Sequence, residues 1–286
     1  MLGDRLMVQA AGVAFFAVLS VAPVLVTALS IYGFVNTPET ATRQLSDIAD
    51  TLPDDLESIV IDQLTSITAA SAQVLTWRGL TGLLVALWTA MTAMTYLIDG
   101  VNLAYRQTET RGLLRRSGLA LVFVLGGALL LAALIAVAGR AAAELVGAPG
   151  PVQTAASVGS WVALAVLMAV GLAVLYRVAP DRRHAQWRWI TAGSVLATAV
   201  WLAVTLGFFT YVQNLGNYQS TYGSLAGVAI SMFWLWATVT LVFLGAAVNA
   251  ETERQTECDS TVGPDRPVGS RGAVVADSTP PYPRGS

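Results

Sequence analysis

The sequence predicts an all-α, polytopic integral membrane protein with six transmembrane helices and an external amphipathic helical segment between the first and the second. Three observations predict this class. Hydrophobic residues make up 55% of the 286 residues and charged residues only 12%, whereas a soluble domain carries about 25% charged residues. The mean hydropathy is +0.62. Six separate stretches are also long and apolar enough to cross a bilayer, so an ordinary soluble enzyme and a largely disordered chain are excluded.

A membrane-spanning helix needs about 20 mostly apolar residues. The stretches that meet this requirement lie at about 8–35, 79–101, 117–140, 155–178, 188–212 and 223–249. The first is too long for the apolar core of a signal peptide, and no convincing cleavage site follows it, so we expect it to remain as a helix. Together these spans form the expected membrane domain, residues 1–253.

Arginine supplies every basic side chain, because the chain contains no lysine. Thirteen of the 16 arginines lie near the start, in the loops 102–116 and 177–188, and in the tail. The other three, Arg43, Arg78 and Arg140, fall on the opposite side of the membrane. Since loops on the cytoplasmic side are enriched in Lys and Arg, this distribution predicts that both termini are cytoplasmic.

The expected external segment, residues 36–78, has the apolar period of an amphipathic helix. Pro53 interrupts this period, and Thr51 to Asp55 resemble the start of a new helix, with proline and acids in its first turn. We expect two short helices over the outer face. They form either a structural cap or a lid or partner surface.

The tail, residues 254–286, is rich in Pro, Gly, Ser, Asp and Arg and has few apolar residues. This composition predicts a disordered cytoplasmic tail, because such a segment has little apolar surface to bury.

Polar residues within the first span fall on one helical face. Ser20, Pro23 and Thr27 follow one another at spacings of three and four residues. Pro23 removes the hydrogen bond to the carbonyl of Leu19 and predicts a kink. The kink either packs with the hydroxyls bonded to their own backbone or opens an internal cavity.

The second span carries a slanted polar stripe that runs from mid-membrane to the cytoplasmic end. Its members recur every three or four residues and are Thr89, Thr92, Thr95, Asp99 and Asn102. Asp99 is the only acid within the expected spans. It is either an interfacial carboxylate paired with an arginine such as Arg106 or a functional carboxylate.

Two further polar groups lie near the ends of the fifth and sixth spans. Asn249, close to the inner end of the sixth span, is placed to hydrogen-bond across helices. The external rim after the fifth span carries no charge but many hydrogen-bonding groups: Gln213, Asn214, Asn217 and Tyr218. That rim is either a turn that satisfies its own backbone or a surface for head groups or sugar hydroxyls.

Motifs for nucleotide binding, hydrolysis and metal binding are absent from the sequence. The single cysteine, Cys258, and the single histidine, His184, lie in separate polar segments and form no metal site. The net charge of −2 gives no electrostatic reason to expect nucleic acid as a partner. We therefore expect no enzyme activity, no cofactor and no metal.

Several segments form a recognisable set of motifs: AAGVAFF at 10–16, SVAP at 20–23, YGSLAG at 222–227 and LGAAVNAE at 244–251, with Asn102 and Tyr105 fitting a pattern after the second span. Together they resemble the YihY/BrkB family of bacterial inner-membrane proteins. The resemblance covers about 1–254 and leaves the tail outside. It implies six spans, cytoplasmic termini and a bacterial plasma membrane location. It also implies a link to virulence, serum resistance and movement of envelope lipids, while the family's older ribonuclease BN label is regarded as mistaken.

Two functional hypotheses follow. In the first, the protein is a transporter or flippase that moves a lipid-like or envelope-precursor substrate. Asp99 is then the coupling or gating group, and the polar residues of the first two spans, together with Asn249, lie along the path. In the second, it is a non-transporting scaffold for envelope assembly, and the hydroxyls within the membrane only pack helices. A ribonuclease is disfavoured, because phosphate hydrolysis needs clustered carboxylates or histidines that hold metals.

Overall fold

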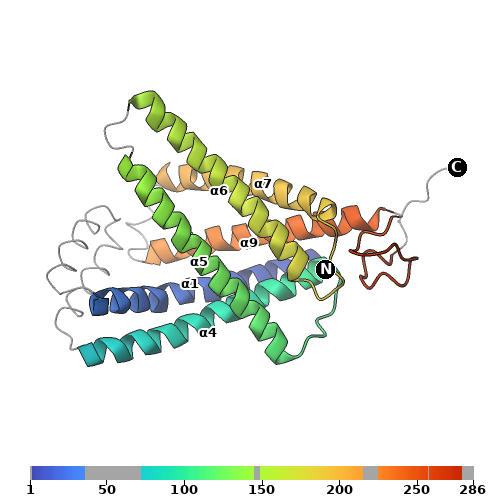
Figure 1. Cartoon of the computed structure of the whole chain (residues 1–286), viewed down its shortest axis with the longest axis horizontal. Helices are drawn as coiled ribbons and strands as arrows, with labels where there is room; N and C mark the ends of the chain where they lie inside the picture. Colours follow the sequence, from blue (N-terminus) through green and yellow to red (C-terminus); the bar gives the residue numbers. More distant parts are fainter. Residues whose placement is uncertain (1, 36–71, 145–148, 215–224, 257, 279–286) are drawn as a thin grey trace. The chain divides into compact units, whose positions relative to one another are not determined.

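The computed structural model describes residues 2–35, 72–144, 149–214, 225–256 and 258–278. Within them the regular structure is helical, with one isolated β-bridge between Ala185 and Thr261. Figure 1 shows the six helices: α1 (Leu2–Val35), α4 (Ala72–Ala104), α5 (Leu113–Glu144), α6 (Gly150–Val178), α7 (Arg188–Asn214) and α9 (Leu225–Arg254). The all-α class is confirmed.

Each of these helices contains a stretch that is long and apolar enough to cross a membrane. The stretches are Arg5–Val24, Trp77–Ala104, Leu113–Leu130, Gly150–Val178, Arg188–Val212 and Ala226–Arg254. The shortest helix, α7, has 27 residues and is therefore about 40 Å long, which exceeds the roughly 30 Å hydrocarbon core. Large apolar side chains such as Leu129, 73% exposed, face outward, as expected of helices that contact lipid.

The helices extend beyond the expected spans because a helix continues through the polar interface after the hydrocarbon ends. α1 begins at Leu2, and α9 continues to Arg254. Of the expected external segment 36–78, residues 36–71 lie outside the described residues, and residues 72–78 form the first two turns of α4.

The chain divides into two compact units. The first consists of 1–13, 94–214 and 236–286, and the second of 14–93 and 215–235. In the second unit, Phe16 packs edge-to-face against Phe15 and Trp88, with ring centroids 5.2 and 6.4 Å apart, and so joins α1 to α4. The candidate site described below lies in the first unit.

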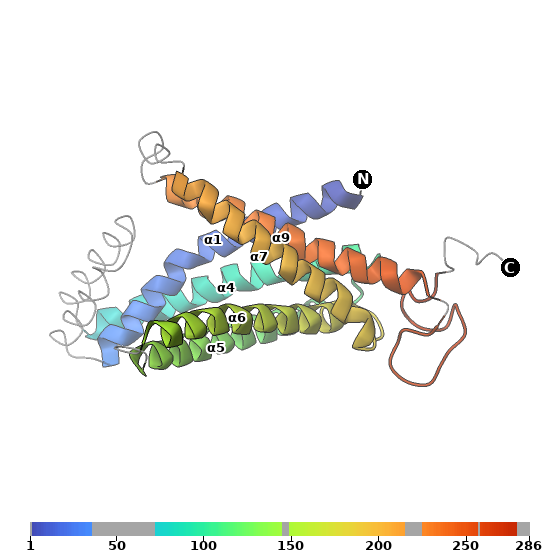
Figure 2. The ribbon, with the colours of Figure 1, turned by 90° about the horizontal axis from the view of Figure 1, so that it is seen from above.

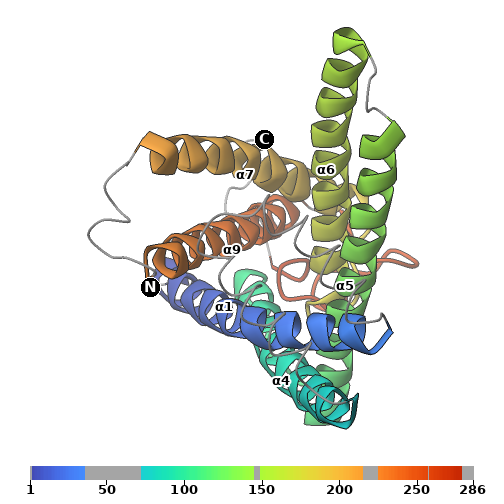
Figure 3. The ribbon, with the colours of Figure 1, turned by 90° about the vertical axis from the view of Figure 1, so that its left-hand side faces the viewer.

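In the first unit, α5 and α6 run side by side in opposite directions in all three ribbon views (Figures 1, 2 and 3). α7 packs closely on α9. A Cβ atom added at Gly193 of α7 would lie 2.2 Å from the carbonyl oxygen of Gly245 in α9. The two helix backbones approach so closely that only glycine fits at this crossing.

The tail, which the composition predicts to be disordered, forms polar contacts over residues 258–278. It pairs with the connection between α6 and α7, seen beyond the end of α9 in Figure 2. The amide of Gln186 donates to the carbonyl of Ser260, and the amide of Val262 donates to the carbonyl of His184, both at 2.9 Å. The composition does not predict these contacts, because they are made by backbone and polar groups and not by an apolar core.

Three charged side chains organise that segment by bonding its backbone. The Asp259 carboxylate accepts from the amides of Thr261 and Arg266 at 2.9 and 3.0 Å. The buried Arg271 guanidinium donates to the carbonyl of Ala276 at 2.9 Å, and Asp277 accepts from the amide of Gly269 at 2.8 Å. The amino-acid composition shows only that these residues are polar and does not show which backbone groups they bond. A prediction from composition alone is therefore disorder.

Candidate functional site

The polar stripe of α4 begins with two threonines whose hydroxyls bond to their own helix. Thr89 is fully buried and donates to the carbonyl of Val85 at 2.9 Å. Thr92 donates to the carbonyl of Trp88 at 2.7 Å. These bonds satisfy the hydroxyls within one helix, as packed threonines do. Thr95, one turn further along, is partly buried.

The candidate residues of α1 lie in the second unit. The Ser20 hydroxyl likewise donates to its own helix, at the carbonyl of Ala17, at 2.6 Å. Pro23 lies inside α1, which continues through it to Val35. Thr27 is within the same helix, but its side chain is outside those described.

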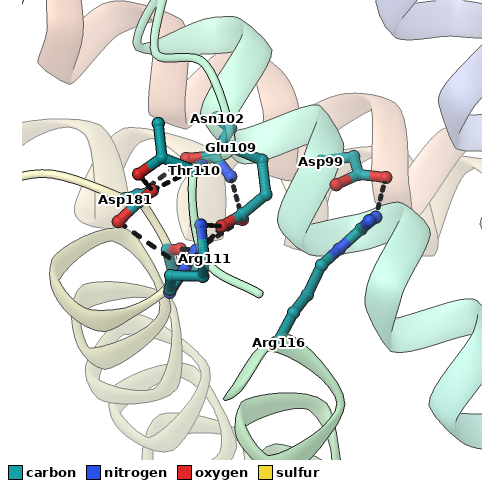
Figure 4. A network of polar contacts seen from close by, with 8 residues as sticks. Asp99, Asn102, Glu109, Thr110, Arg111, Arg116 and Asp181 are labelled. Atoms are coloured by element: carbon teal, nitrogen blue, oxygen red, sulfur yellow. Dashed lines mark hydrogen bonds and ion pairs between the residues drawn. The ribbon is translucent and has the colours of Figure 1, made fainter. Parts of the chain in front are cut away.

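Asp99 forms an ion pair with Arg116, which lies in the first turn of α5 (Figure 4). The two side chains are 27% and 23% exposed, respectively. The sequence suggested Arg106 as a partner, but Arg106 is exposed in the turn after α4, with φ of 56°. The pair therefore joins the candidate spans of α4 and α5, whereas a pair with Arg106 would have stayed at the end of α4.

A second set of contacts begins at Asn102, the last member of the stripe, which is 3% exposed. Its side-chain amide donates to Glu109 at 2.9 Å, and its amide oxygen accepts from the backbone of Asp181 at 2.8 Å. Glu109 accepts two hydrogen bonds of 2.7 Å from the guanidinium of Arg111 and a third of 3.0 Å from its backbone amide. The backbone amide of Thr110 donates to the Asp181 carboxylate at 2.7 Å. This network ties the α4–α5 loop to the α6–α7 loop (Figure 4).

The carboxylates of this network are held in their charged form. Burial alone would raise the pKa of Glu109, but the hydrogen bonds and charge of Arg111 outweigh it and lower that pKa. Burial also opposes the shift at Asp181, where hydrogen bonds from Thr110 and the charge of Arg111 lower the pKa. Because the folded-state values are depressed, these contacts contribute stability above the unfolded values of about 4, and the contribution is lost as the pH falls through the lowered values.

A buried ion pair lies nearby within the same unit. The Arg182 guanidinium donates two hydrogen bonds of 2.9 Å to Glu253, and each side chain is only 1% exposed. The Arg182 guanidinium also lies 4.8 Å from the ring centroid of Tyr105, and burial raises the pKa of that tyrosine. Ser260 of the tail donates to Glu253. This pair joins the α6–α7 loop to the end of α9 and to the tail.

Asn249 confirms the expected bond across helices. It is fully buried, and its amide oxygen accepts from the backbone of Gly193 at 2.7 Å while its nitrogen donates to the carbonyl of Ile190 at 3.0 Å. Both polar ends of its amide are therefore satisfied by α7. The side chain holds α7 against α9 at the point of closest approach.

The expected external rim is largely outside the described residues. Asn217 and Tyr218 fall in the gap, and Gln213 and Asn214 are the last residues of α7, with side chains outside those described. Their role stays a prediction.

The residues that form most of the charged contacts are not among the predicted site residues. They are Glu109, Arg111, Asp181, Arg182 and Glu253. The sequence carries a signal for them, because acids and arginines occur within a few residues of one another in each of three segments, 109–111, 181–183 and 251–254. Over the described ranges, no group of three or more His, Cys, Asp or Glu side chains is arranged to hold a metal ion.

Comparison with known proteins identifies the family. The family described as virulence factor BrkB matches residues 1–268. The chain belongs to the virulence factor BrkB family. The match to this BrkB family extends beyond the expected limit at residue 254 and includes the first part of the tail, where Ser260 contacts Glu253.

BrkB-family relatives are described as membrane proteins or as ribonuclease-like. The chain is 29% identical over 250 residues to the ribonuclease-like protein YfkH of Bacillus subtilis, covering 85% of this chain and 88% of YfkH. It is 25% identical to the UPF0761 membrane protein Smlt0865 of Stenotrophomonas maltophilia, covering 87% of this chain and 58% of that protein. A third relative, the UPF0761 membrane protein RC1_0578 of Rhodospirillum centenum, is 26% identical over 93% of this chain and 59% of its own length. The chain thus spans less than two thirds of these two UPF0761 proteins. No solved structure matches the chain.

Proposed function

We propose that this membrane protein is a transporter or flippase that moves a lipid-like or envelope-precursor molecule between the two leaflets. The observation that carries the proposal is the ion pair between Asp99 and Arg116, which bridges the candidate spans of α4 and α5. Ionisable residues within membrane spans cost free energy and commonly mark pathways or coupling groups.

The partial exposure of this pair supports a gating role. Asp99 and Arg116 are both about a quarter exposed, unlike the fully enclosed pair of Arg182 and Glu253. An anionic head group that reached Arg116 would compete with Asp99 for the guanidinium, so that binding of the cargo and opening of the pair would be coupled. The sequence has no nucleotide-binding motif, so transport would be passive, coupled to an ion or driven by a partner.

The proposal includes an orientation and a location. We place the chain in a bacterial plasma membrane with both termini in the cytoplasm, so that the pair lies near the cytoplasmic interface. The arginine distribution supports this placement. The relatives named above come from bacteria, and two of them are described as membrane proteins.

Replacing Asp99 with Asn should abolish transport while leaving the folded protein in the membrane, because the variant removes the charge but keeps a similar shape. Quantitative lipidomics of cells depleted of the protein would identify a lipid that accumulates. We expect wild-type protein to clear this lipid and Asp99→Asn to leave it at the depleted level. The matched control is Glu251→Gln, which removes a more exposed acid, 46% exposed and paired with Arg254, and should clear the lipid normally.

The transport role of Asp99 is refuted if the Asp99→Asn protein, present at the wild-type amount, clears the lipid as fully as wild type. Accumulation can also follow from blocked envelope assembly. The candidate lipid must therefore also be moved between leaflets in liposomes that contain the purified protein, at a rate that Asp99→Asn reduces to that of empty liposomes.

A scaffold for envelope assembly is the second candidate. The observation that favours it is the bonding of Ser20, Thr89 and Thr92 to their own helix backbones, since these hydroxyls then pack helices instead of lining a path. A scaffold would tolerate Asp99→Asn, and depletion would leave the lipid profile unchanged.

We expect the purified protein to be inert on RNA, with no activity above that of a protein-free control. The carboxylates at the site support this expectation, because Asp99, Glu109 and Asp181 are already engaged with arginine or backbone donors and nuclease metals need free carboxylate oxygens. The measurement is cleavage of a labelled RNA by detergent-purified protein with added Mg²⁺ or Mn²⁺. Metal-dependent cleavage that copurifies with the protein would contradict the expectation.

A further inference from the structure

Two arginines flank the connection between α6 and α7, Arg177 in the last turn of α6 and Arg188 at the start of α7, and each lies over a tryptophan ring. The guanidinium carbon of Arg177 is 4.3 Å from the ring centroid of Trp187. The guanidinium carbon of Arg188 is 5.3 Å from that of Trp189. A cation–π contact of this kind holds the guanidinium near the ring face and does not require its N–H groups as hydrogen-bond donors.

These two arginines differ from others at the same end of the unit. Ion pairs in the described part of the chain engage the guanidinium groups of Arg111, Arg116, Arg182 and Arg254. Neither Arg177 nor Arg188 has a carboxylate within ion-pair distance among the described residues, and no described acceptor receives a hydrogen bond from either guanidinium. Each therefore retains a positive charge and several donors for an external anion.

Their position along the helices places them at the membrane interface. Arg177 lies in the last turn of the candidate span Gly150–Val178, and Arg188 is the first residue of the span Arg188–Val212. Trp187, between them, is 52% exposed, as is common for tryptophans at the level of the head groups. Both arginines thus lie at an end of a candidate span, where lipid phosphates are expected.

We propose that Arg177 and Arg188, supported by Trp187 and Trp189, bind the phosphate of an anionic phospholipid in the adjacent leaflet. Arginine binds phosphate through paired N–H donors, and the exposed indole of Trp187 offers an apolar face to the glycerol and upper acyl chain. Two positive charges favour a head group with net negative charge over a zwitterionic one, whose ammonium they repel. The site does not depend on the proposed transport, because it lies at the facing ends of α6 and α7 and uses neither Asp99 nor Arg116.

The test is lipid retention by the full chain, purified in detergent and followed by native mass spectrometry during titration with dioleoyl phosphatidylglycerol or dioleoyl phosphatidylcholine. We expect wild type to retain phosphatidylglycerol selectively. The double variant Arg177→Gln/Arg188→Gln should bind it about tenfold more weakly. Arg188→Gln alone, at an exposed position that packing does not require, should weaken binding in the same direction and covers the case in which the double variant does not fold.

The matched control is Arg254→Gln, which removes the same charge from an arginine already paired with Glu251 and should bind phosphatidylglycerol as wild type does. Equal retention by wild type and Arg188→Gln would overturn the proposal, as would an equal loss in Arg254→Gln, since net charge alone would then explain it. Equal retention of the two lipids by wild type would also overturn it. Competition by millimolar inorganic phosphate without any lipid preference would assign the site to free phosphate and refute the lipid.

Discussion

Replacing Glu253 with Gln should lower the free energy of unfolding by about 3–5 kcal/mol, the typical cost of removing one partner of a buried ion pair. Glu253 and Arg182 are each 1% exposed, so the variant leaves a positive charge that water does not reach. Tyr105 stacks on that charge, but its ring does not replace a carboxylate. The measurement is equilibrium unfolding of the purified protein in detergent micelles.

Glu251→Gln is the internal control for this experiment. Glu251 lies on the same helical end and pairs with Arg254, but its side chain is 46% exposed. Solvent-exposed pairs of this kind contribute about 0–1 kcal/mol. A similar small loss in both variants would show that the Arg182–Glu253 contact is not enclosed as the structure has it.

The double replacement Arg182→Leu/Glu253→Leu measures the net contribution of the ion pair to the free energy of unfolding. It does so without leaving one buried charge unpaired, as Glu253→Gln does. Apolar substitution of both members of a buried pair is often close to neutral. We therefore expect the double variant to be more stable than Glu253→Gln. If it is less stable than that single variant, the pair itself is strongly stabilising and the leftover charge is not the main cost.

The same pair should govern the order of the tail, because Ser260 donates to Glu253. In Glu253→Gln, amide hydrogen exchange should rise first in the residues that pair with the α6–α7 connection, at Ser260 and Val262. This local change is expected before any loss of the helices, since the helices hold their own backbone bonds.

The six spans could be predicted from the sequence because they depend on local composition. A run of about 20 apolar residues is enough to predict a membrane-spanning helix, whatever the rest of the chain does. The span of α6 has the highest mean hydropathy, and this helix ends at the predicted residue, Val178. Asn249 was also predictable in part, since a buried amide near a helix end must find a partner. Its bonds to the α7 backbone satisfy that need.

The charged site could not be predicted in the same way, because its partners are far apart in the sequence. The sequence offers nearby Arg106 as one possible partner of Asp99, but the ion pair forms with Arg116, in the first turn of α5. Glu253 and Arg182 are 71 residues apart, and nothing local links them. The contacts that Asp259, Arg271 and Asp277 make with the backbone of the tail could not be predicted either, because a count of apolar residues does not detect them.

Replacing Gly193 with Ala should destabilise the protein by about 3 kcal/mol, at the upper end of the usual cost of overpacking. The added Cβ would lie 2.2 Å from the carbonyl oxygen of Gly245 and 2.6 Å from the side chain of Asn249. A flexible side-chain end could move aside, but the Gly245 carbonyl belongs to the backbone of α9. The helices must therefore separate, and the bonds from Asn249 to Gly193 and Ile190 lengthen with them.

Gly207→Ala in the same helix is the matched control, because a Cβ there would have no described neighbour within 4 Å. Alanine is at least as good a helix former as glycine, so this variant should unfold at or above the wild-type denaturant concentration. The comparison isolates close helix approach from helix propensity, since both substitutions are identical and both lie in α7. If Gly193→Ala unfolds together with Gly207→Ala, α7 and α9 are not held in contact at this crossing, and Asn249 then cannot be the residue that joins them.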